Sequence, residues 1–132
     1  MIDSTKFGIG SSIPVVPMAL EDETKEFYLE FLGYEIDWEH RFNSSQNSEL
    51  YMLIHLGDSV LHLNGHADPD SAPIETRIPV EHLQEYAQFL CQKKSRFGMP
   101  QPVDPRYEGK NTDMNIRDPF GNLLTFWLRE SK

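Results

Sequence analysis

The side chains best suited to bind a ligand come from two similar segments, 57–63 and 121–128, each of which reads as a turn followed by a strand. Side chains alternate between the two faces of a strand, and the leucine-rich set of each strand is expected to pack under a helix. The opposite face then carries His62, Thr125 and Trp127. An imidazole, a hydroxyl and an indole on one face, neither wholly polar nor wholly apolar, are typical of a ligand-binding concavity.

A third segment, Tyr34 to Phe42, alternates in the same way. Its alternation predicts one face with Ile36, Trp38, His40 and Phe42, and another face with the charged side chains between them. Trp38 and His40 are therefore added to the predicted ligand-binding residues, because aromatic faces stack on flat rings and on cations. Alternatives stay open, since both tryptophans could serve core or interface packing and His62 could be a hydrogen-bonded buried histidine.

The elements that must position these residues occur twice along the chain. Met52 and Ile54 lie 62 positions before Met114 and Ile116, and after the turn the separation becomes 63, so that His62 corresponds to Thr125. The repeat extends towards the N-terminus, where Val16-Pro17-Met18 lies 62 positions before Ile78-Pro79-Val80, and Phe27 lies 62 before Phe89. This spacing predicts two copies of one strand–helix–strand–strand–strand unit.

The boundaries of the two copies follow from turn-forming stretches. We predict an N-terminal arm at 1–12, a first module at 13–65, a linker at 66–74 and a second module at 75–130. Helices are expected at Glu21–Leu32 and His82–Lys94, and a polar hairpin loop at 43–48. The segment from Met99 to Tyr107 contains three prolines, which predicts a short or irregular strand. Asp118, before Pro119, is predicted to cap a turn.

Composition limits the possible partners. The chain has 132 residues, enough for one compact domain, and a net charge of −9, which argues against nucleic acid or an anionic membrane as a partner. Its single cysteine, Cys91, cannot form an internal disulfide bond. There is no apolar run of membrane-spanning length and no signal-peptide core, so we expect a cytoplasmic protein.

Three segments carry a resemblance to a known family: F-Y-L-E-F-L-G-Y-E at 27–35, G-D-S-V-L-H-L at 57–63 and D-P-F-G-N-L-L-T-F at 118–126. With D-W-E-H-R-F at 37–42, the sequence resembles the glyoxalase/bleomycin-resistance/extradiol-dioxygenase (vicinal oxygen chelate) superfamily, in particular its bleomycin-resistance-like subgroup. The resemblance implies an α+β fold of two βαβββ modules, whose curled mixed sheets form a cup with the helices on the outer face. It also implies a homodimer.

The same resemblance places metal-ligand positions of the family's enzymes at Ile13, His62, Glu75 and Thr125. Of these four residues only His62 and Glu75 have good donor atoms, and a divalent metal ion generally requires three or four protein ligands. We therefore expect neither a metal nor another cofactor, with His62 and Glu75 as weak metal candidates. Glu75 joins the predicted ligand-binding residues, although it could equally be a solvated acid at a strand end.

Three functional hypotheses follow. The first is a non-enzymatic protein that sequesters a small molecule, for example a cationic antibiotic such as bleomycin, and so confers antibiotic resistance. The second is a metal-dependent lyase, isomerase or dioxygenase of the same superfamily, with His62 and Glu75 as ligands or as a general base pair. The third is a structural or regulatory dimer whose cup is filled by its own side chains.

Overall fold

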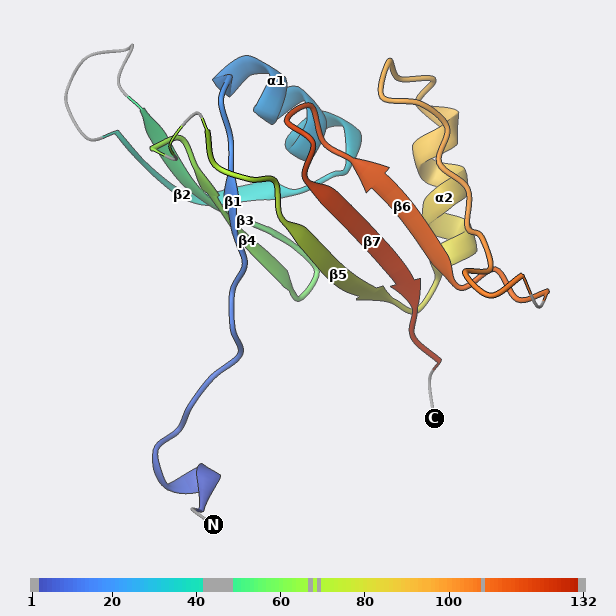
Figure 1. Ribbon diagram of the computed structural model, residues 1–132, viewed down its shortest axis with the longest axis horizontal. Helices are drawn as coiled ribbons and strands as arrows, with labels where there is room; N and C mark the ends of the chain where they lie inside the picture. Colours follow the sequence, from blue (N-terminus) through green and yellow to red (C-terminus); the bar gives the residue numbers. More distant parts are fainter. Residues whose placement is uncertain (1–2, 42–48, 67, 69, 108, 131–132) are drawn as a thin grey trace.

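The computed structural model describes residues 3–41, 49–66, 68, 70–107 and 109–130, and contains two separate β-sheets with helices packed against them (Figure 1). The four-stranded sheet has the order β1 (Val15–Pro17), β4 (Ser59–Asn64), β3 (Leu50–Leu56) and β2 (Glu35–Arg41). The three-stranded sheet has the order β5 (Glu75–Val80), β7 (Leu123–Leu128) and β6 (Asp113–Arg117). The predicted hairpin loop at 43–48 lies outside the described residues.

The helical segments are η1 (Ser4–Lys6), α1 (Glu21–Lys25), η2 (Glu26–Phe31) and α2 (Leu83–Gln92). The first predicted helix therefore forms as an α-helical turn, α1, that continues as a π-helical segment, η2. Acidic residues occupy the first turn of α1, where the helix dipole favours negative charge. Gly33 follows the helix with φ of +99°, a conformation that glycine adopts without strain.

Strand pairing repeats between the two sheets and confirms the alignment predicted from the sequence. Each sheet is mixed, because the first strand of each module pairs in parallel with the last strand and the remaining pairs are antiparallel. Val16 lies opposite Leu63 in the four-stranded sheet, and Ile78 lies opposite Phe126 in the three-stranded sheet. The predicted α+β fold of two βαβββ modules is thus confirmed.

The second module lacks a regular counterpart of β2. Between Met99 and Tyr107 the described chain forms only an isolated bridge, which joins Val103 to Asp113 at the outer edge of β6. Prolines have no N–H group to donate to a β-ladder, and three of them interrupt this segment. The prediction of a short or irregular strand is confirmed.

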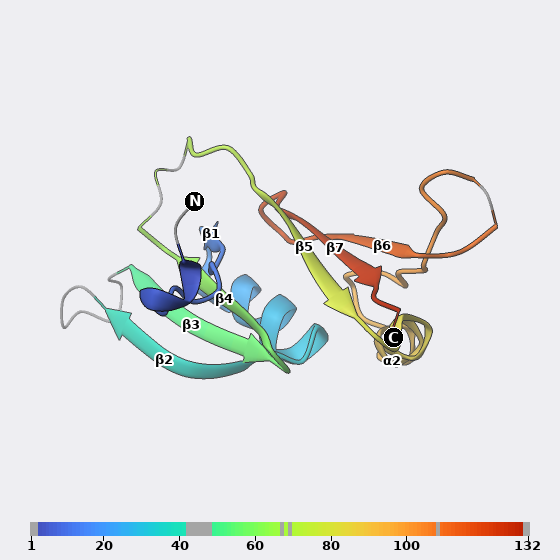
Figure 2. The same cartoon turned by 90° about the horizontal axis from the view of Figure 1, so that it is seen from below.

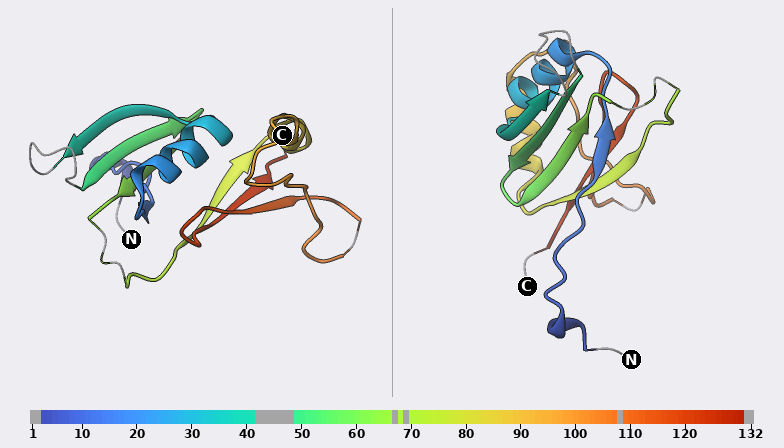
Figure 3. Two further views of the ribbon diagram at one scale, coloured as in Figure 1. Left: turned by 90° about the horizontal axis from the view of Figure 1, so that it is seen from above. Right: turned by 90° about the vertical axis from the view of Figure 1, so that its left-hand side faces the viewer.

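One hydrophobic core joins both modules. Leu61, Leu63, Leu124 and Phe126 face this core and are at most 1% exposed, as their alternation predicted. The α1–η2 segment lies between the two sheets, and α2 packs on β7 (Figures 2 and 3). At the contact between the helices, Tyr86 donates a hydrogen bond to the carbonyl of Leu32 at 2.8 Å.

A buried polar cluster ties the last turn of the second module to the first module. Asp118 accepts hydrogen bonds from the backbone N–H groups of Phe120 and Asn122, and from the Tyr28 hydroxyl of η2 at 2.7 Å. Asn122 donates its amide to Asp118 and to the carbonyl of Pro17 in β1. Asp118 therefore caps its turn, as predicted, and also holds the two modules together. We call Tyr28, Asp118 and Asn122 the inter-module latch.

Candidate functional site

The face of the four-stranded sheet that points away from the helices is organised by a β-bulge in β2. Ile36 pairs with Ile54 and Trp38 with Leu53, so the register shifts by one residue at Asp37. Ile54 is fully buried under the helices, whereas Leu53 belongs to the opposite face. The prediction that Ile36 shares a face with Trp38 and His40 is therefore wrong, because the extra residue interrupts the alternation. Phe42, the fourth predicted member, lies outside the described residues.

Four rings follow one another on this open face. The indole of Trp38 stacks on the imidazole of His40, with centroids 5.8 Å apart and an interplanar angle of 7°. Tyr51 meets Trp38 edge-on at 6.3 Å and His62 edge-on at 5.4 Å. Trp38 remains 51% exposed, so a ligand can reach its ring. We call Trp38, His40, Tyr51 and His62 the aromatic row.

His62 is the most constrained member of the aromatic row. Its Nδ1 atom lies 2.8 Å from the Tyr51 hydroxyl, so a hydrogen bond between the two orients both rings. Its Nε2 atom is buried, and among the described residues it has no hydrogen-bond partner. An unsatisfied buried nitrogen is costly, which makes this atom a position where a ligand or a bound water molecule can supply the missing hydrogen bond.

The bulge places a charged group beside the aromatic row. His55 lies on the same face, with Nδ1 at 2.8 Å from the Asp37 carboxylate and Nε2 at 3.5 Å from the Glu35 carboxylate. The His55 imidazole therefore lies between two carboxylates. This part of the face is net negative, because one imidazole can offset at most one of the two carboxylates.

The other predicted ligand-binding residues lie on the three-stranded sheet. Thr125 is buried and donates its hydroxyl to the Asn115 side chain at 2.8 Å. Trp127 is half-buried on the same face of β7, and Glu75 is exposed at the start of β5. Arg77 and Asp113 form an exposed ion pair at 3.4 Å between the outer strands of this sheet.

The six predicted ligand-binding residues thus divide between the two sheets. Trp38, His40 and His62 come together on the four-stranded sheet, whereas Glu75, Thr125 and Trp127 belong to the three-stranded sheet. The sequence analysis missed Tyr51, although its position on the face of β3 away from the helices follows from the alternation of buried residues in that strand.

The family's metal-ligand positions do not form a metal site within this chain. Ile13 has no donor atom, the Thr125 hydroxyl is engaged by Asn115, and Nδ1 of His62 is engaged by Tyr51. Among the described residues, no group of three or more His, Cys, Asp or Glu side chains could hold a metal ion. His62 lies on the four-stranded sheet and Glu75 on the three-stranded sheet.

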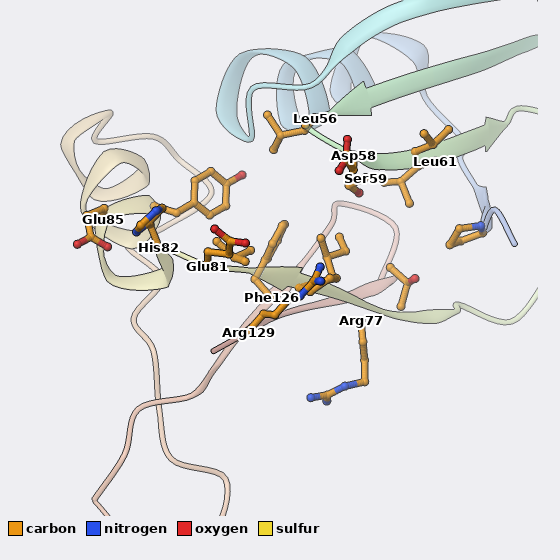
Figure 4. A pocket seen from close by; sticks show the side chains of 18 of the residues that line it. Leu56, Asp58, Ser59, Leu61, Arg77, Glu81, His82, Glu85, Phe126 and Arg129 are labelled. Atoms are coloured by element: carbon orange, nitrogen blue, oxygen red, sulfur yellow. The ribbon is translucent and has the colours of Figure 1, made fainter. Parts of the chain in front are cut away.

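A cavity of about 770 Å³ lies between the modules, away from the aromatic row (Figure 4). The turn between β3 and β4 forms one wall, and the end of β5 with the start of α2 forms the other. None of the six predicted ligand-binding residues lines it. We call this cavity the inter-module groove; its walls include Leu56, Asp58, Val60, Ile78, Glu81 and Phe126.

The fold consists of two βαβββ modules with open, mixed sheets. It defines the class of proteins with which this chain can be compared. The family description "Glyoxalase superfamily protein" matches residues 3–132. The chain belongs to this superfamily, which confirms the resemblance drawn from its motifs.

Solved structures share the fold. A bleomycin-binding protein complexed with bleomycin is 22% identical, with a TM-score of 0.61, and the match covers 92% of this chain and 100% of that chain. A bleomycin resistance determinant encoded on the transposon Tn5 is also 22% identical, with a TM-score of 0.63 and coverage of 93% and 100%. A glyoxalase family protein from Enterococcus faecalis is 19% identical, with a TM-score of 0.61 and coverage of 92% and 98%. A comparison with curated protein sequences gave no match.

No helix in the described parts of the chain is long and apolar enough to span a membrane.

Proposed function

We propose that the protein binds and sequesters a small organic molecule, without chemical conversion, against the aromatic row of the four-stranded sheet. The observation that carries this proposal is the set of four contiguous rings on an open sheet face, in which Trp38 is 51% exposed. Stacking of a ligand ring on Trp38 removes apolar surface from water, and Nε2 of His62 supplies a directional hydrogen bond.

The ligand class that fits is a flat aromatic compound with a positive charge. Indole and phenol rings attract cations over their faces, and the Asp37 and Glu35 carboxylates lie on the same face near His55. The net charge of −9 favours the approach of a cation over that of an anion. The structural similarity to a bleomycin-binding protein makes bleomycin the first compound to test.

A second copy of the chain supplies the other wall of the site in this proposal. Glu75, Thr125 and Trp127 form a polar and aromatic face on the three-stranded sheet, which one chain does not bring to its own aromatic row. In a homodimer each aromatic row would face the partner's three-stranded sheet, giving two equivalent sites by symmetry. A cytoplasmic protein with such sites would lower the free concentration of an antibiotic and so confer resistance.

Calorimetric titration with bleomycin and with smaller planar cations tests this proposal. We expect Trp38→Leu and His62→Ala each to weaken binding about 10-fold, which corresponds to about 1.4 kcal/mol. Phe89→Leu is the matched control, because Phe89 is a comparably exposed aromatic residue, 48% exposed on α2 and outside the site. Mass spectrometry of the recovered ligand should show it unchanged.

Two results would contradict the proposal. Equal affinities in the Trp38→Leu, His62→Ala and Phe89→Leu variants would remove the aromatic row as the binding surface. Conversion of the ligand at a rate abolished by His62→Ala would favour the alternative of a lyase, isomerase or dioxygenase over sequestration.

A further inference from the structure

His62 and Tyr51 are held by the two inner strands of the four-stranded sheet. β4 pairs with β1 and β3, and β3 pairs with β4 and β2 (Figure 1). Leu53 lies opposite His62, so Tyr51 is the diagonal neighbour of His62, at a separation that an aromatic side chain can span. The backbone N–H of His62 also donates to the carbonyl of Pro14 at 3.0 Å. Both side chains therefore extend from backbone that is fixed by strands on either side.

The hydrogen bond between the Tyr51 hydroxyl and Nδ1 of His62 decides which imidazole nitrogen carries the proton. The two atoms are 2.8 Å apart, and the rings meet edge-on at an angle of 85°. A phenol is a better donor than acceptor, and an unprotonated imidazole nitrogen is the stronger acceptor of the pair. The stronger bond therefore has the hydroxyl donating to Nδ1, which leaves the proton of the neutral ring on Nε2.

Nε2 of His62 is accordingly a hydrogen-bond donor that a ligand can satisfy. It is buried, and it has no hydrogen-bond partner within the part of the chain that the structure describes. In a protonated ring both nitrogens donate, so Nε2 is a donor in that state as well. A buried donor without an acceptor is costly, and binding therefore favours a molecule that supplies one. An ammonium group in the same position offers only further donors and would leave Nε2 unsatisfied.

The strand register also gives the separation between this donor and the exposed indole. Trp38 in β2 and His62 in β4 both pair with Leu53 in β3, so they are two strand spacings apart, which is roughly 10 Å. A ring system that stacks on Trp38 therefore reaches His62 only if it extends across Leu53. The acceptor belongs at the end of the ligand that is distant from the ring stacked on Trp38.

We propose that the aromatic row selects a planar aromatic cation that carries a hydrogen-bond acceptor, such as a carbonyl oxygen, at one end. Nε2 of His62 donates to this acceptor, and Tyr51 is the positioning residue that keeps the proton on Nε2. The inference rests on the proposed function, because it names the ligand class of the same site. The Asp37 and Glu35 carboxylates beside His55 attract the positive charge, so the cation and the acceptor are recognised by different groups.

Two probes of equal charge and nearly equal shape test the requirement for an acceptor. One is an N-methylquinolinium cation with an acetyl group on its carbocyclic ring, and the other has an isopropenyl group at the same carbon. We expect calorimetric titration to show about 10-fold tighter binding of the acetyl probe to the wild type, and equal binding of both probes to His62→Ala. A water molecule on Nε2 does not change this expectation, because the isopropenyl group would displace it without replacing its hydrogen bond.

Tyr51→Phe tests the positioning role, because it keeps the ring and removes only the hydroxyl. We expect the preference for the acetyl probe to fall at least about 3-fold, since Nδ1 of His62 is then free to carry the proton. A change in packing alone would alter both affinities equally and leave the preference unchanged. Tyr34→Phe is the matched control and should keep the preference, because the Tyr34 hydroxyl is hydrogen-bonded to Ser59 at 2.7 Å outside the aromatic row. An unchanged preference in Tyr51→Phe would overturn its positioning role.

Two-bond ¹H–¹⁵N spectra of the histidine side chains report the tautomer directly. They are recorded at pH 8, where a free imidazole is neutral, and the His62 signals are assigned by their loss in His62→Ala. We expect a protonated Nε2 and an unprotonated Nδ1 in the wild type. A protonated Nδ1 would overturn the proposal, because the Tyr51 hydroxyl would then be the acceptor.

The titrations also separate the failure of this inference from the failure of the proposed function. Equal affinities of the two probes for the wild type, both reduced in Trp38→Leu, would overturn the requirement for an acceptor and leave the binding surface standing. Affinities of both probes that are unchanged in Trp38→Leu, or no binding of either probe to the wild type, would overturn both proposals.

Discussion

The two modules differ on one face and agree on the other. On the helix side, Met52 and Met114 are both fully buried, and Ile54 and Ile116 occupy matching buried positions. On the open side, Tyr51 of the four-stranded sheet corresponds to Asp113 of the three-stranded sheet, and His62 corresponds to Thr125. The rings of the first module are thus replaced in the second by an ion pair with Arg77 and a hydrogen bond to Asn115.

This difference reflects the different requirements on core positions and on positions of the open face. A core position must match the volume of its neighbours, so the two copies need similar apolar residues there. An open face has no such requirement, and in the described residues the row of rings lies on the four-stranded sheet. The latch adds a second asymmetry, because Asp118 and Asn122 of the second module hold Tyr28 and Pro17 of the first.

The largest effect expected concerns two phenylalanines at equal positions of the repeat. Phe27 is fully buried and Phe89 is 48% exposed, so Phe27→Ala should lower the free energy of unfolding by about 4 kcal/mol and Phe89→Ala by less than about 1 kcal/mol. Urea denaturation monitored by circular dichroism measures both. Equal losses would contradict the difference in burial between these two positions of the repeat.

The latch is tested by Asp118→Ala, with Asp58→Ala in the matching turn of the first module as its control. Removal of the Asp118 carboxylate leaves the Tyr28 hydroxyl and two backbone N–H groups without an acceptor, at a cost of about 3 kcal/mol. Asp58 is exposed, and its loss should cost less than about 0.5 kcal/mol. A loss for Asp118→Ala no larger than that for Asp58→Ala would show that the latch does not stabilise the contact between the modules.

Alkaline pH probes the same latch with a smaller effect. Burial first, and then the charge of Asp118, raise the pKa of Tyr28, while burial raises the pKa of Tyr34 to about 12. Burial also raises the pKa of Tyr86. An unfolded chain ionises tyrosine near a pKa of about 10. Between that pH and the folded pKa only the unfolded state loses the proton, so stability is intact below about pH 10 and falls above it.

Each of these tyrosines should remove about 1.4 kcal/mol of stability per pH unit above about pH 10. Tyr28→Phe is therefore expected to make the decline less steep, and Tyr107→Phe, at a residue that is 96% exposed, to leave its slope unchanged. Urea titrations at several pH values between 8 and 11 measure the slopes. An identical slope in the wild type and Tyr28→Phe would contradict the buried hydroxyl in the latch.

Much of this fold could be predicted from the spacing of apolar residues. The apolar residues of each strand must all face the core, and a shift of one residue in the pairing would turn them to the opposite face. The repeat therefore fixes the strand register. The bulge at Asp37 could not be predicted in this way, since an inserted residue leaves the local sequence looking like an uninterrupted strand. That single residue explains why Ile36 was assigned to the wrong face.

The candidate site was predicted in part. His62 and Trp38 were found because strand alternation fixes the face of each, and the bulge left Trp38 and His40 together. The hydrogen bond between Tyr28 and Asp118 joins residues 90 positions apart, and a local sequence pattern does not predict such a contact. The sequence therefore indicated which residues face outward within a strand, but not which distant residues meet.

The central claim is that the aromatic row of the four-stranded sheet is the surface that receives a ligand. The two indole N–H signals in ¹H–¹⁵N spectra of the protein test it most directly while bleomycin or a smaller planar cation is added. We expect the Trp38 signal to shift to saturation with the binding curve, and the same shift in His62→Ala to require about 10-fold more ligand. A compound that binds tightly while the Trp38 signal stays in place would contradict the account.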